Sequence, residues 1–259
     1  MAINAFKMTR RVWRALLFRE LQTRLFSSRT SMLWMVIEPL FHMSYLLFIF
    51  TIIKIRHVSG VTPGIWLLMG LISYYFFSWT SQQVSNAIGA NKSLFAFRQI
   101  LPFDTCIARA VVEAILLLII FSIICFILAV FTDVTWPVDV LKFISAWACL
   151  WVLGIAWGML LGIMEELFSD FSKVLKLISM PLYFFSGIIF PLSVVPQSVQ
   201  DIMLFNPLVH AIEASRSGLS DYYHTIPGID INYSWMFSVC LLLIAMALQR
   251  KFSRRLLAV

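Results

Sequence analysis

The side chains best suited to acid–base chemistry lie near the C-terminal end of the chain, at His210, Glu213 and Arg216. Residues three apart share one face of a helix, so a histidine and a carboxylate at this spacing could exchange a proton. The same spacing also lets the three side chains hydrogen-bond to one another, with the arginine neutralising the glutamate. Catalysis would need a convergent nucleophile or acid–base set. We therefore expect an internal brace and assign no catalytic residue.

A second pair of ionisable residues, Glu38 and His42, interrupts an apolar stretch. Ionisable groups inside a membrane span are costly and usually face the bundle interior or a water-filled cavity. At a spacing of four on a helix the two could hydrogen-bond to each other, or they could line a path. Arg109 and Glu113 have the same spacing, and we expect them to pair.

The sequence lacks the common motifs for nucleotide, metal or nucleophilic chemistry. It contains no GxxxxGKS, GxxxxGKT, HExxH, CxxC or GxSxG pattern. The four cysteines lie in or beside apolar stretches without metal-ligand spacing, and we interpret them as packing residues. We expect no metal or cofactor in this chain.

The composition is that of a protein that crosses a membrane several times. Apolar residues make up 61% of the 259 residues and charged residues only 13%, whereas soluble domains carry roughly 25% charged residues. We predict an all-α fold in a single domain, residues 1–259. The apolar stretches predict six transmembrane helices, at residues 32–53, 65–88, 106–131, 141–164, 174–189 and 233–248.

The predicted second span, residues 65–88, changes character along its length. Its first half carries aromatic residues that include Tyr74, Tyr75 and Trp79, and its second half contains hydroxyl and amide side chains such as Gln82. Exposure to lipid would leave the amides unpaired. This half must therefore be covered by protein or wetted.

The predicted fourth span carries Gly154, Gly158 and Gly162 at intervals of four residues. Small residues at this spacing let two helices approach closely. The stripe predicts helix packing and no chemistry.

Residues 4–29 combine seven basic residues with an apolar stripe at helical spacing. This pattern is typical of an amphipathic helix that lies in the membrane interface. Its arginines, among them Arg10, Arg11, Arg14 and Arg24, could bind anionic lipid or meet an anionic substrate.

Residues 90–105 form a short, partly basic stretch whose helical pattern ends at Pro102. Lys92, Phe95, Phe97 and Arg98 would form a small amphipathic surface there. The stretch is either an ordinary linker or a helix that docks a soluble partner.

Residues 190–219 are too apolar for a water-exposed loop and too interrupted to span a bilayer. Prolines break the first part, a short helix can start at Gln197, and Asn206 with Pro207 separates it from a second helix that ends near Leu219. Non-helical backbone at membrane depth needs cover from protein or a water-filled cavity. We predict a re-entrant helical hairpin before the last span.

The basic residues are distributed unevenly among the predicted loops. With the N-terminus inside, sixteen of the twenty Lys and Arg fall on the cytoplasmic side. This excess agrees with the positive-inside rule. Both termini are thus predicted to be cytoplasmic, the hairpin opens on the outer side, and the net charge of +7 reflects cytoplasmic loops rather than nucleic-acid binding.

The order of these parts resembles the transmembrane subunit of the type-2 ABC exporters, and within it the capsular-polysaccharide export permeases of Gram-negative bacteria. The most specific segments are SGIIFPLSVVP at 186–196 and FNPLVHAIEASRSGL at 205–219. They match the family patterns SGxxFPL and NPLxHxxExxR. The resemblance covers the whole chain, although O-antigen and teichoic-acid exporters share the architecture.

The resemblance implies a homodimer of this subunit in the bacterial inner membrane with two copies of a separate ATPase. That ATPase would bind ATP and Mg²⁺ and dock on residues 90–105 through Lys92, Phe95, Phe97 and Arg98. The implied substrate is a lipid-linked, acidic polysaccharide. A periplasmic or outer-membrane copolymerase and export partner would continue its path.

The resemblance also implies a substrate path between the first, second and fifth spans, where aromatic faces suit sugars and cations suit an acidic polymer. The expected path residues are Arg10, Arg11, Arg14, Arg24, Glu38, His42, Tyr74, Tyr75, Trp79 and Gln82. A periplasmic gate would contain Phe190, Pro191, His210, Glu213 and Arg216. A related exporter of O-antigen, teichoic acid or small lipophilic compounds is the alternative, and a membrane-bound enzyme or a non-transporting scaffold is the rival from another class.

Overall fold

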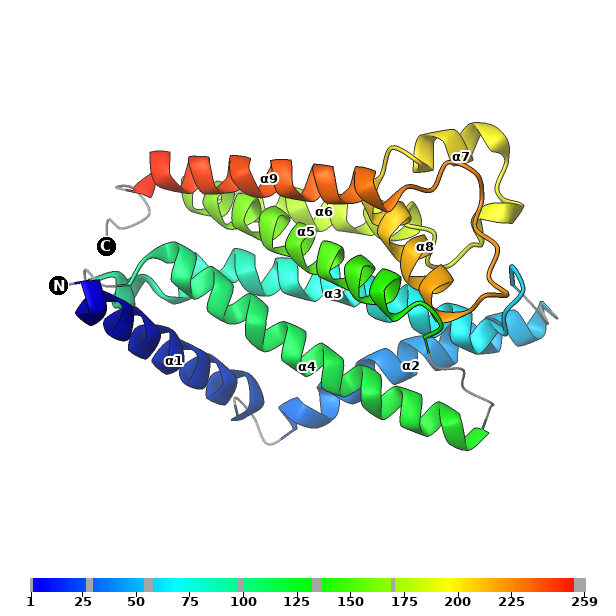
Figure 1. Ribbon diagram of the computed structural model, residues 1–259, viewed down its shortest axis with the longest axis horizontal. Coiled ribbons are helices and arrows are strands. Elements are labelled where there is room, and N and C mark those ends of the chain that lie inside the picture. The colour runs from blue at the N-terminus through cyan, green and yellow to red at the C-terminus, as the bar shows by residue number, and fades with distance from the viewer. Residues whose placement is uncertain are drawn as a thin grey trace.

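The computed structural model describes residues 2–26, 30–53, 58–96, 100–131, 137–168 and 171–253. Within these ranges the regular elements are helical, as predicted for an all-α fold. In chain order they are α1 (Ala2–Phe26), α2 (Ser31–Ile52), α3 (Pro63–Ala90), η1 (Lys92–Ala96), α4 (Pro102–Phe131), α5 (Val140–Leu167), α6 (Phe171–Phe184), η2 (Leu192–Val194), α7 (Gln197–Met203), α8 (Pro207–Leu219) and α9 (Ile231–Lys251). The long helices run lengthwise along one bundle (Figure 1).

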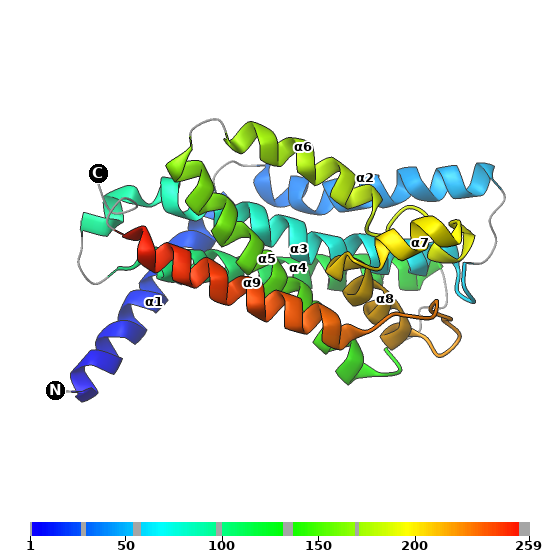
Figure 2. The same cartoon turned by 90° about the horizontal axis from the view of Figure 1, so that it is seen from above.

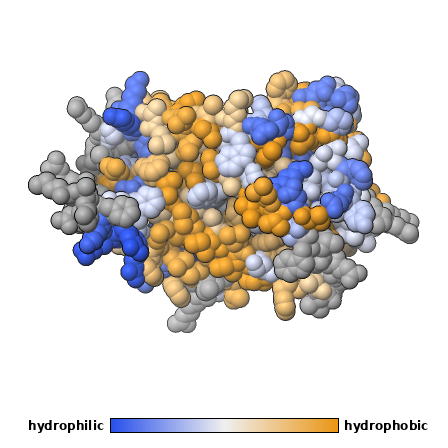
Figure 3. Space-filling view, viewed as in Figure 1, coloured by the Kyte–Doolittle hydropathy of each residue, from blue (hydrophilic) through white to orange (hydrophobic). Residues whose placement is uncertain are grey.

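Four helices in the described part of the chain are long and apolar enough to cross a membrane. They are Leu33–Ile52, Pro102–Ile127, Val140–Leu167 and Ile231–Lys251, which correspond to the predicted first, third, fourth and sixth spans. The visible face of the molecule carries a broad apolar middle with hydrophilic residues toward both ends (Figure 3). This surface suits a bilayer around the middle of the bundle.

The other two predicted spans differ from simple apolar helices. Helix α3 has 28 residues, enough to cross a bilayer core of about 30 Å, but its polar second half dilutes its apolar character. Helix α6 has 14 residues and contains Pro181, so it is shorter than the ~20 residues of a typical span. Helix α6 ends at Phe184, where the chain turns, whereas the fifth span was predicted to continue to residue 189. The count of six spans stays a prediction.

Helix α3 lies at the centre of the bundle, and α5 packs along it (Figures 1 and 2). A Cβ atom added at Gly154 would lie 2.8 Å from the Phe77 carbonyl oxygen, and one at Gly158 would lie 2.5 Å from that of Ser81. One at Gly162 would lie 2.6 Å from the Ser85 carbonyl oxygen. The predicted glycine stripe is thus the contact at which the backbones of α5 and α3 meet.

The burial of α3 explains how a helix with many polar groups fits this bundle. Trp66 to Phe77 are buried without a break, because α2, α4, α5 and α8 all pack against α3. The Ser73 hydroxyl lies 2.8 Å from that of Ser215 on α8 and accepts a 3.0 Å hydrogen bond from Trp147 on α5. Polar groups inside the bundle are satisfied by neighbouring helices, as the bilayer requires.

Residues 186–219 contain the two short helices that the sequence predicts. Asn206 ends the turn after α7, and its side chain accepts a 3.1 Å hydrogen bond from the Leu208 amide at the start of α8. Pro207 occupies the first turn, where its missing N–H costs nothing. Helices α7 and α8 lie at the end of the bundle opposite both chain termini (Figures 1 and 2). Their re-entrant position in a membrane stays a prediction.

The glycine contact between α3 and α5 generates the first prediction. Gly158→Val should lower the free energy of unfolding by about 2 kcal/mol, because the added side chain overpacks the backbone of Ser81. Gly64→Ala is the matched control, since a Cβ there meets its nearest atom, on Leu47, only at 3.9 Å. Thermal denaturation of the detergent-solubilised protein measures both. Equal melting temperatures for the two variants would contradict the close approach.

Candidate functional site

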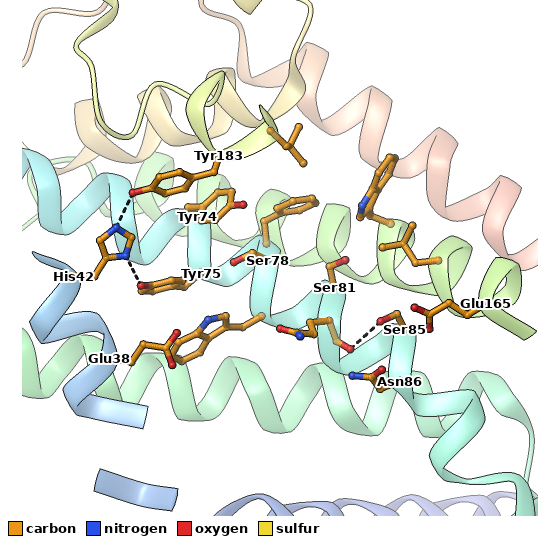
Figure 4. Close-up of a pocket in the computed structure, with 16 residues that line it drawn as sticks. Glu38, His42, Tyr74, Tyr75, Ser78, Ser81, Ser85, Asn86, Glu165 and Tyr183 are labelled. Carbon is orange, nitrogen blue, oxygen red and sulfur yellow. Dashed lines mark hydrogen bonds between the residues drawn. The ribbon is translucent and has the colours of Figure 1, made fainter. Parts of the chain in front are cut away.

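A groove of about 550 Å³ lies between α2, α3, α5 and α6 (Figure 4). Its lining combines aromatic, amide, hydroxyl and carboxylate side chains. The residues are Glu38, His42, Tyr74, Tyr75, Phe77, Ser78, Trp79, Ser81, Gln82, Ser85, Asn86, Trp157, Leu161, Glu165, Leu182 and Tyr183. Six of the predicted path residues, Glu38 to Gln82, are thereby brought to one surface.

His42 connects three helices at one end of the groove (Figure 4). Its Nδ1 lies 2.9 Å from the Tyr75 hydroxyl on α3, and its Nε2 lies 2.8 Å from the Tyr183 hydroxyl on α6. Of the two alternatives for Glu38 and His42, the mutual hydrogen bond is not formed, because both ring nitrogens of His42 bond to phenols. Glu38 is exposed and lines the groove instead.

Aromatic rings form a continuous surface beside this histidine. Tyr75 and Trp79, four residues apart on α3, stack with centroids 4.6 Å apart and an interplanar angle of 27°. Tyr74 meets the edge of Tyr183 at 5.1 Å. Such rings offer flat apolar faces next to the polar groups of the groove.

A second cavity of about 840 Å³ continues along the same side of the bundle. It is mainly apolar, with Tyr45, Leu46 and Phe50 from α2 and Phe184 from α6 among its lining residues. Phe190 and Pro191, predicted for the outer gate, also line it. His42 and Tyr183 line both cavities, so the two spaces meet at that pair.

Ten of the sixteen lining residues were not among the predicted path residues, and three of them illustrate why. Tyr183 follows Pro181 in the fifth apolar stretch, Trp157 lies next to Gly158, and Glu165 ends the fourth apolar stretch. The sequence did offer a signal for Tyr183, because this residue is aromatic and lies in a span that was already expected to line the path. Sequence spacing alone does not predict that Trp157 and Glu165 lie beside α3. Their position depends on how α5 packs against α3.

The basic helix α1 is attached to α4 by ion pairs. Arg24 donates to both carboxylate oxygens of Glu113, at 3.1 and 3.2 Å, and Arg109 lies 2.7 Å from Glu20. The expected pair between Arg109 and Glu113 is wrong, because each residue has a partner on α1. Arg24 is thus engaged inside the protein, while Arg10, Arg11 and Arg14 are exposed.

Further contacts extend this attachment toward the end of α3. Trp13 donates a 3.0 Å hydrogen bond to Asp104 at the start of α4. Arg19 donates to the side chain of Asn91, which follows α3. One side of α1 therefore belongs to the bundle, and the other carries the exposed arginines.

The charged residues of α8 form two clusters rather than one. Glu213 accepts a 2.8 Å hydrogen bond from Arg216 and a 2.7 Å bond from the Tyr223 hydroxyl, and the Arg216 guanidinium lies 3.9 Å from the centre of the Trp66 ring. Arg216 also donates to the Gly187 carbonyl at 2.8 Å. Burial raises the pKa of the Tyr223 phenol, which stays a neutral donor.

His210 belongs to a different cluster, which corrects the expected trio. Its Nε2 lies 2.7 Å from the Leu204 carbonyl and its Nδ1 accepts a 3.0 Å bond from the Asp230 amide. Nδ1 is therefore the unprotonated nitrogen and Nε2 the donor. The histidine joins α8 to the loops before and after it, and Glu213 with Arg216 joins α8 to α3.

The segment predicted to dock a partner is only partly described. Lys92 forms a 2.6 Å ion pair with Glu166 at the end of α5. Phe95 is 8% exposed and packs with Val84 and Ile88, so it is a core residue here and no part of a docking surface. Ser93 is exposed beside it. Phe97 and Arg98 lie outside the described residues.

Within the described ranges, no three His, Cys, Asp or Glu side chains lie close enough together to hold a metal ion.

Comparison with known proteins decides the family. A model of the ABC-2 type transporter membrane family matches residues 11–220. The chain belongs to this family. It is a membrane subunit of a transporter rather than an enzyme.

Relatives match over almost the whole length. The chain is 34% identical to the polysialic acid transport protein KpsM of Escherichia coli, over 96% of each protein. It is 26% identical to the capsule polysaccharide export inner-membrane protein CtrC of Neisseria meningitidis, over 97% of this chain and 95% of the relative. It is 25–26% identical to BexB of Haemophilus influenzae, which has the same description, over 94% of this chain and 92% of the relative.

The ion pairs of α1 generate the second prediction. Arg24→Met should lower the free energy of unfolding by about 2 kcal/mol, because it leaves the buried Glu113 carboxylate without its cation. Arg10→Met is the control on the exposed side, with an expected change below about 0.5 kcal/mol. Thermal denaturation of the purified protein measures both. The same loss in both variants would show that α1 is attached by something other than this pair.

Proposed function

We propose that this protein is the permease subunit of an ATP-driven exporter that carries capsular polysaccharide across the bacterial inner membrane. The observation that carries the proposal is the groove between α2, α3, α5 and α6, which is lined by aromatic, hydroxyl and amide groups. The names of the full-length relatives supply the class of substrate.

The lining of the groove suits sugar rings. Trp79, Tyr74 and Tyr75 contribute aromatic rings to the lining, and Gln82 and Asn86 contribute amides that can both donate and accept hydrogen bonds. A hydroxyl-rich chain can exchange hydrogen bonds with such groups as it moves. Among the described residues that line the groove there are two glutamates and no lysine or arginine.

In this proposal, α1 contacts the anionic end of a lipid-linked substrate. Arg10, Arg11 and Arg14 are exposed on one helix, and basic amphipathic helices bind anionic surfaces. Arg24, also predicted to meet the substrate, is paired with Glu113 and is excluded from this role.

The orientation follows from the charge distribution. Both termini lie at the end of the bundle opposite α7 and α8 (Figure 1), and the sequence places most basic residues on the side of the termini. We infer that this end is cytoplasmic, and that Phe190, Pro191 and the re-entrant hairpin of α7 and α8 lie toward the periplasm. In this arrangement α3 and α6 complete six spans.

The energy source is inferred to be a separate ATPase. The sequence has no phosphate-binding loop, and the family is that of ABC-2 type transporters. We infer a homodimer of this chain with two ATPase subunits, which hold ATP and Mg²⁺, and copolymerase and export partners in the periplasm. The exposed part of the Asn91–Ala96 turn, beside the Lys92–Glu166 ion pair, is the proposed docking site for the ATPase.

The docking site generates the third prediction. Ser93→Arg should reduce the amount of ATPase that co-purifies with this protein about ten-fold, because a bulky charge is placed in the contact. Ser198→Arg is the matched control, since Ser198 is equally exposed at the opposite end of the bundle. Co-purification at the wild-type ratio from both variants would move the docking site elsewhere.

The fourth prediction tests the proposed function itself. Deletion of this chain should leave polysaccharide inside the cytoplasm and remove it from the cell surface, and the wild-type gene should restore both. Fractionation with sugar analysis and surface labelling provide the measurement. Loss of O-antigen or resistance to a drug instead of loss of capsule would favour the related exporters. A normal capsule in the deletion strain would reject the proposal.

A further inference from the structure

The groove and the apolar cavity meet at a hydrogen-bonded cluster of His42, Tyr75 and Tyr183, which we name the latch. His42 and Tyr183 line both spaces. On one side lie the amides and hydroxyls of the groove, and on the other lies the mainly apolar cavity, whose lining includes Phe190. Anything that moves along this face from one space to the other passes the latch.

The latch is saturated in its closed state. The two nitrogens of His42 are 2.9 Å from the Tyr75 hydroxyl and 2.8 Å from the Tyr183 hydroxyl. A neutral imidazole donates with one nitrogen and accepts with the other. One phenol therefore accepts and the other donates, so the closed cluster satisfies donors and acceptors on three different helices (Figure 4).

Tyr183 is the member best placed to move. It follows Pro181, which removes one backbone hydrogen bond from α6 and permits a bend. After α6 the chain turns through Gly187, whose φ of 68° suits glycine. Within the described part of the chain, α6 contacts the bundle sparsely and chiefly through α5. Tyr75, in contrast, is buried on the central helix α3.

We propose that the latch closes the passage between the two cavities and that it opens, by withdrawal of Tyr183, when a polyhydroxylated substrate replaces its hydrogen bonds. This inference rests on the proposed function and adds a specificity determinant to it. Withdrawal alone leaves the His42 nitrogen and the Tyr183 hydroxyl without partners, which is costly away from water. A sugar hydroxyl both donates and accepts and can satisfy either group. An apolar compound cannot, so the latch selects for polyhydroxylated chains.

The fifth prediction uses Tyr183→Phe, which removes the hydroxyl that must leave His42 and keeps the ring. The full-length protein and its ATPase are reconstituted together in vesicles. ATP hydrolysis is measured without substrate and with polysaccharide-bearing lipid extracted from cells that accumulate it. Since the hydrogen bond that resists opening is lost, substrate-free hydrolysis should rise about five-fold, the equivalent of one hydrogen bond. The stimulation by substrate should fall by the same factor.

Tyr222→Phe is the matched control. Tyr222 is exposed in the turn after α8, lines neither cavity, and makes no hydrogen bond through its hydroxyl within the described residues. Its hydrolysis rates should equal those of the wild type. Size-exclusion chromatography verifies assembly of both variants.

The outcomes separate the latch from the function on which it rests. If the assembled Tyr183→Phe variant keeps wild-type hydrolysis and stimulation while cells expressing it export polysaccharide, the latch is wrong and the proposed function stands. If wild-type cells export no polysaccharide through this protein, the proposed function itself fails. Raised substrate-free hydrolysis in Tyr222→Phe as well would also overturn the latch.

Discussion

The close approach of α3 and α5 is the contact on which the rest of the structure depends. Gly154, Gly158 and Gly162 let α5 reach the α3 backbone, so α3 is enclosed on most sides by protein. A helix with so many hydroxyl and amide groups could not face lipid. Enclosure leaves only its side toward α2 and α6 open, and that side carries the groove. Packing by three glycines thus determines where polar groups remain accessible.

Charged residues inside the bundle serve mainly to hold helices in place. Arg24 with Glu113 and Arg109 with Glu20 attach α1 to α4, and Arg216 with Glu213 fixes α8 near Trp66 on α3. The first two pairs join helices that are distant in sequence, and the third, within α8, reaches α3 through the contact of Arg216 with Trp66. A buried charge without such a partner would be strongly unfavourable, so these pairs specify the arrangement of helices whose apolar surfaces alone would permit several. The groove, by contrast, is lined by hydroxyl and amide groups that can exchange one hydrogen-bond partner for another.

The two ends of α3 have different tasks in the proposed transporter. At its N-terminal end, Trp66 contacts the Arg216 guanidinium of α8 and donates a hydrogen bond to the hydroxyl of Tyr223, in the loop after α8. Its other end continues through Asn91 to η1, where Lys92 pairs with Glu166 of α5. Between them lies the latch, which joins α3 to α2 and α6. A force applied by an ATPase near η1 would therefore act on the same helix that lines the path and supports its outer end.

The sequence by itself determined the all-α class, most spans, the break at Asn206 and Pro207, and the family, because these depend on composition, helix periodicity and local motifs. It also assigned six residues to the path that line one groove. Tertiary structure decided the partners: His42 binds two tyrosines instead of Glu38, Glu113 binds Arg24 instead of Arg109, and Phe95 enters the core. Spacing along one helix reveals which pairs are within reach. It cannot reveal a better partner on another helix, because that partner is brought near only when the helices pack.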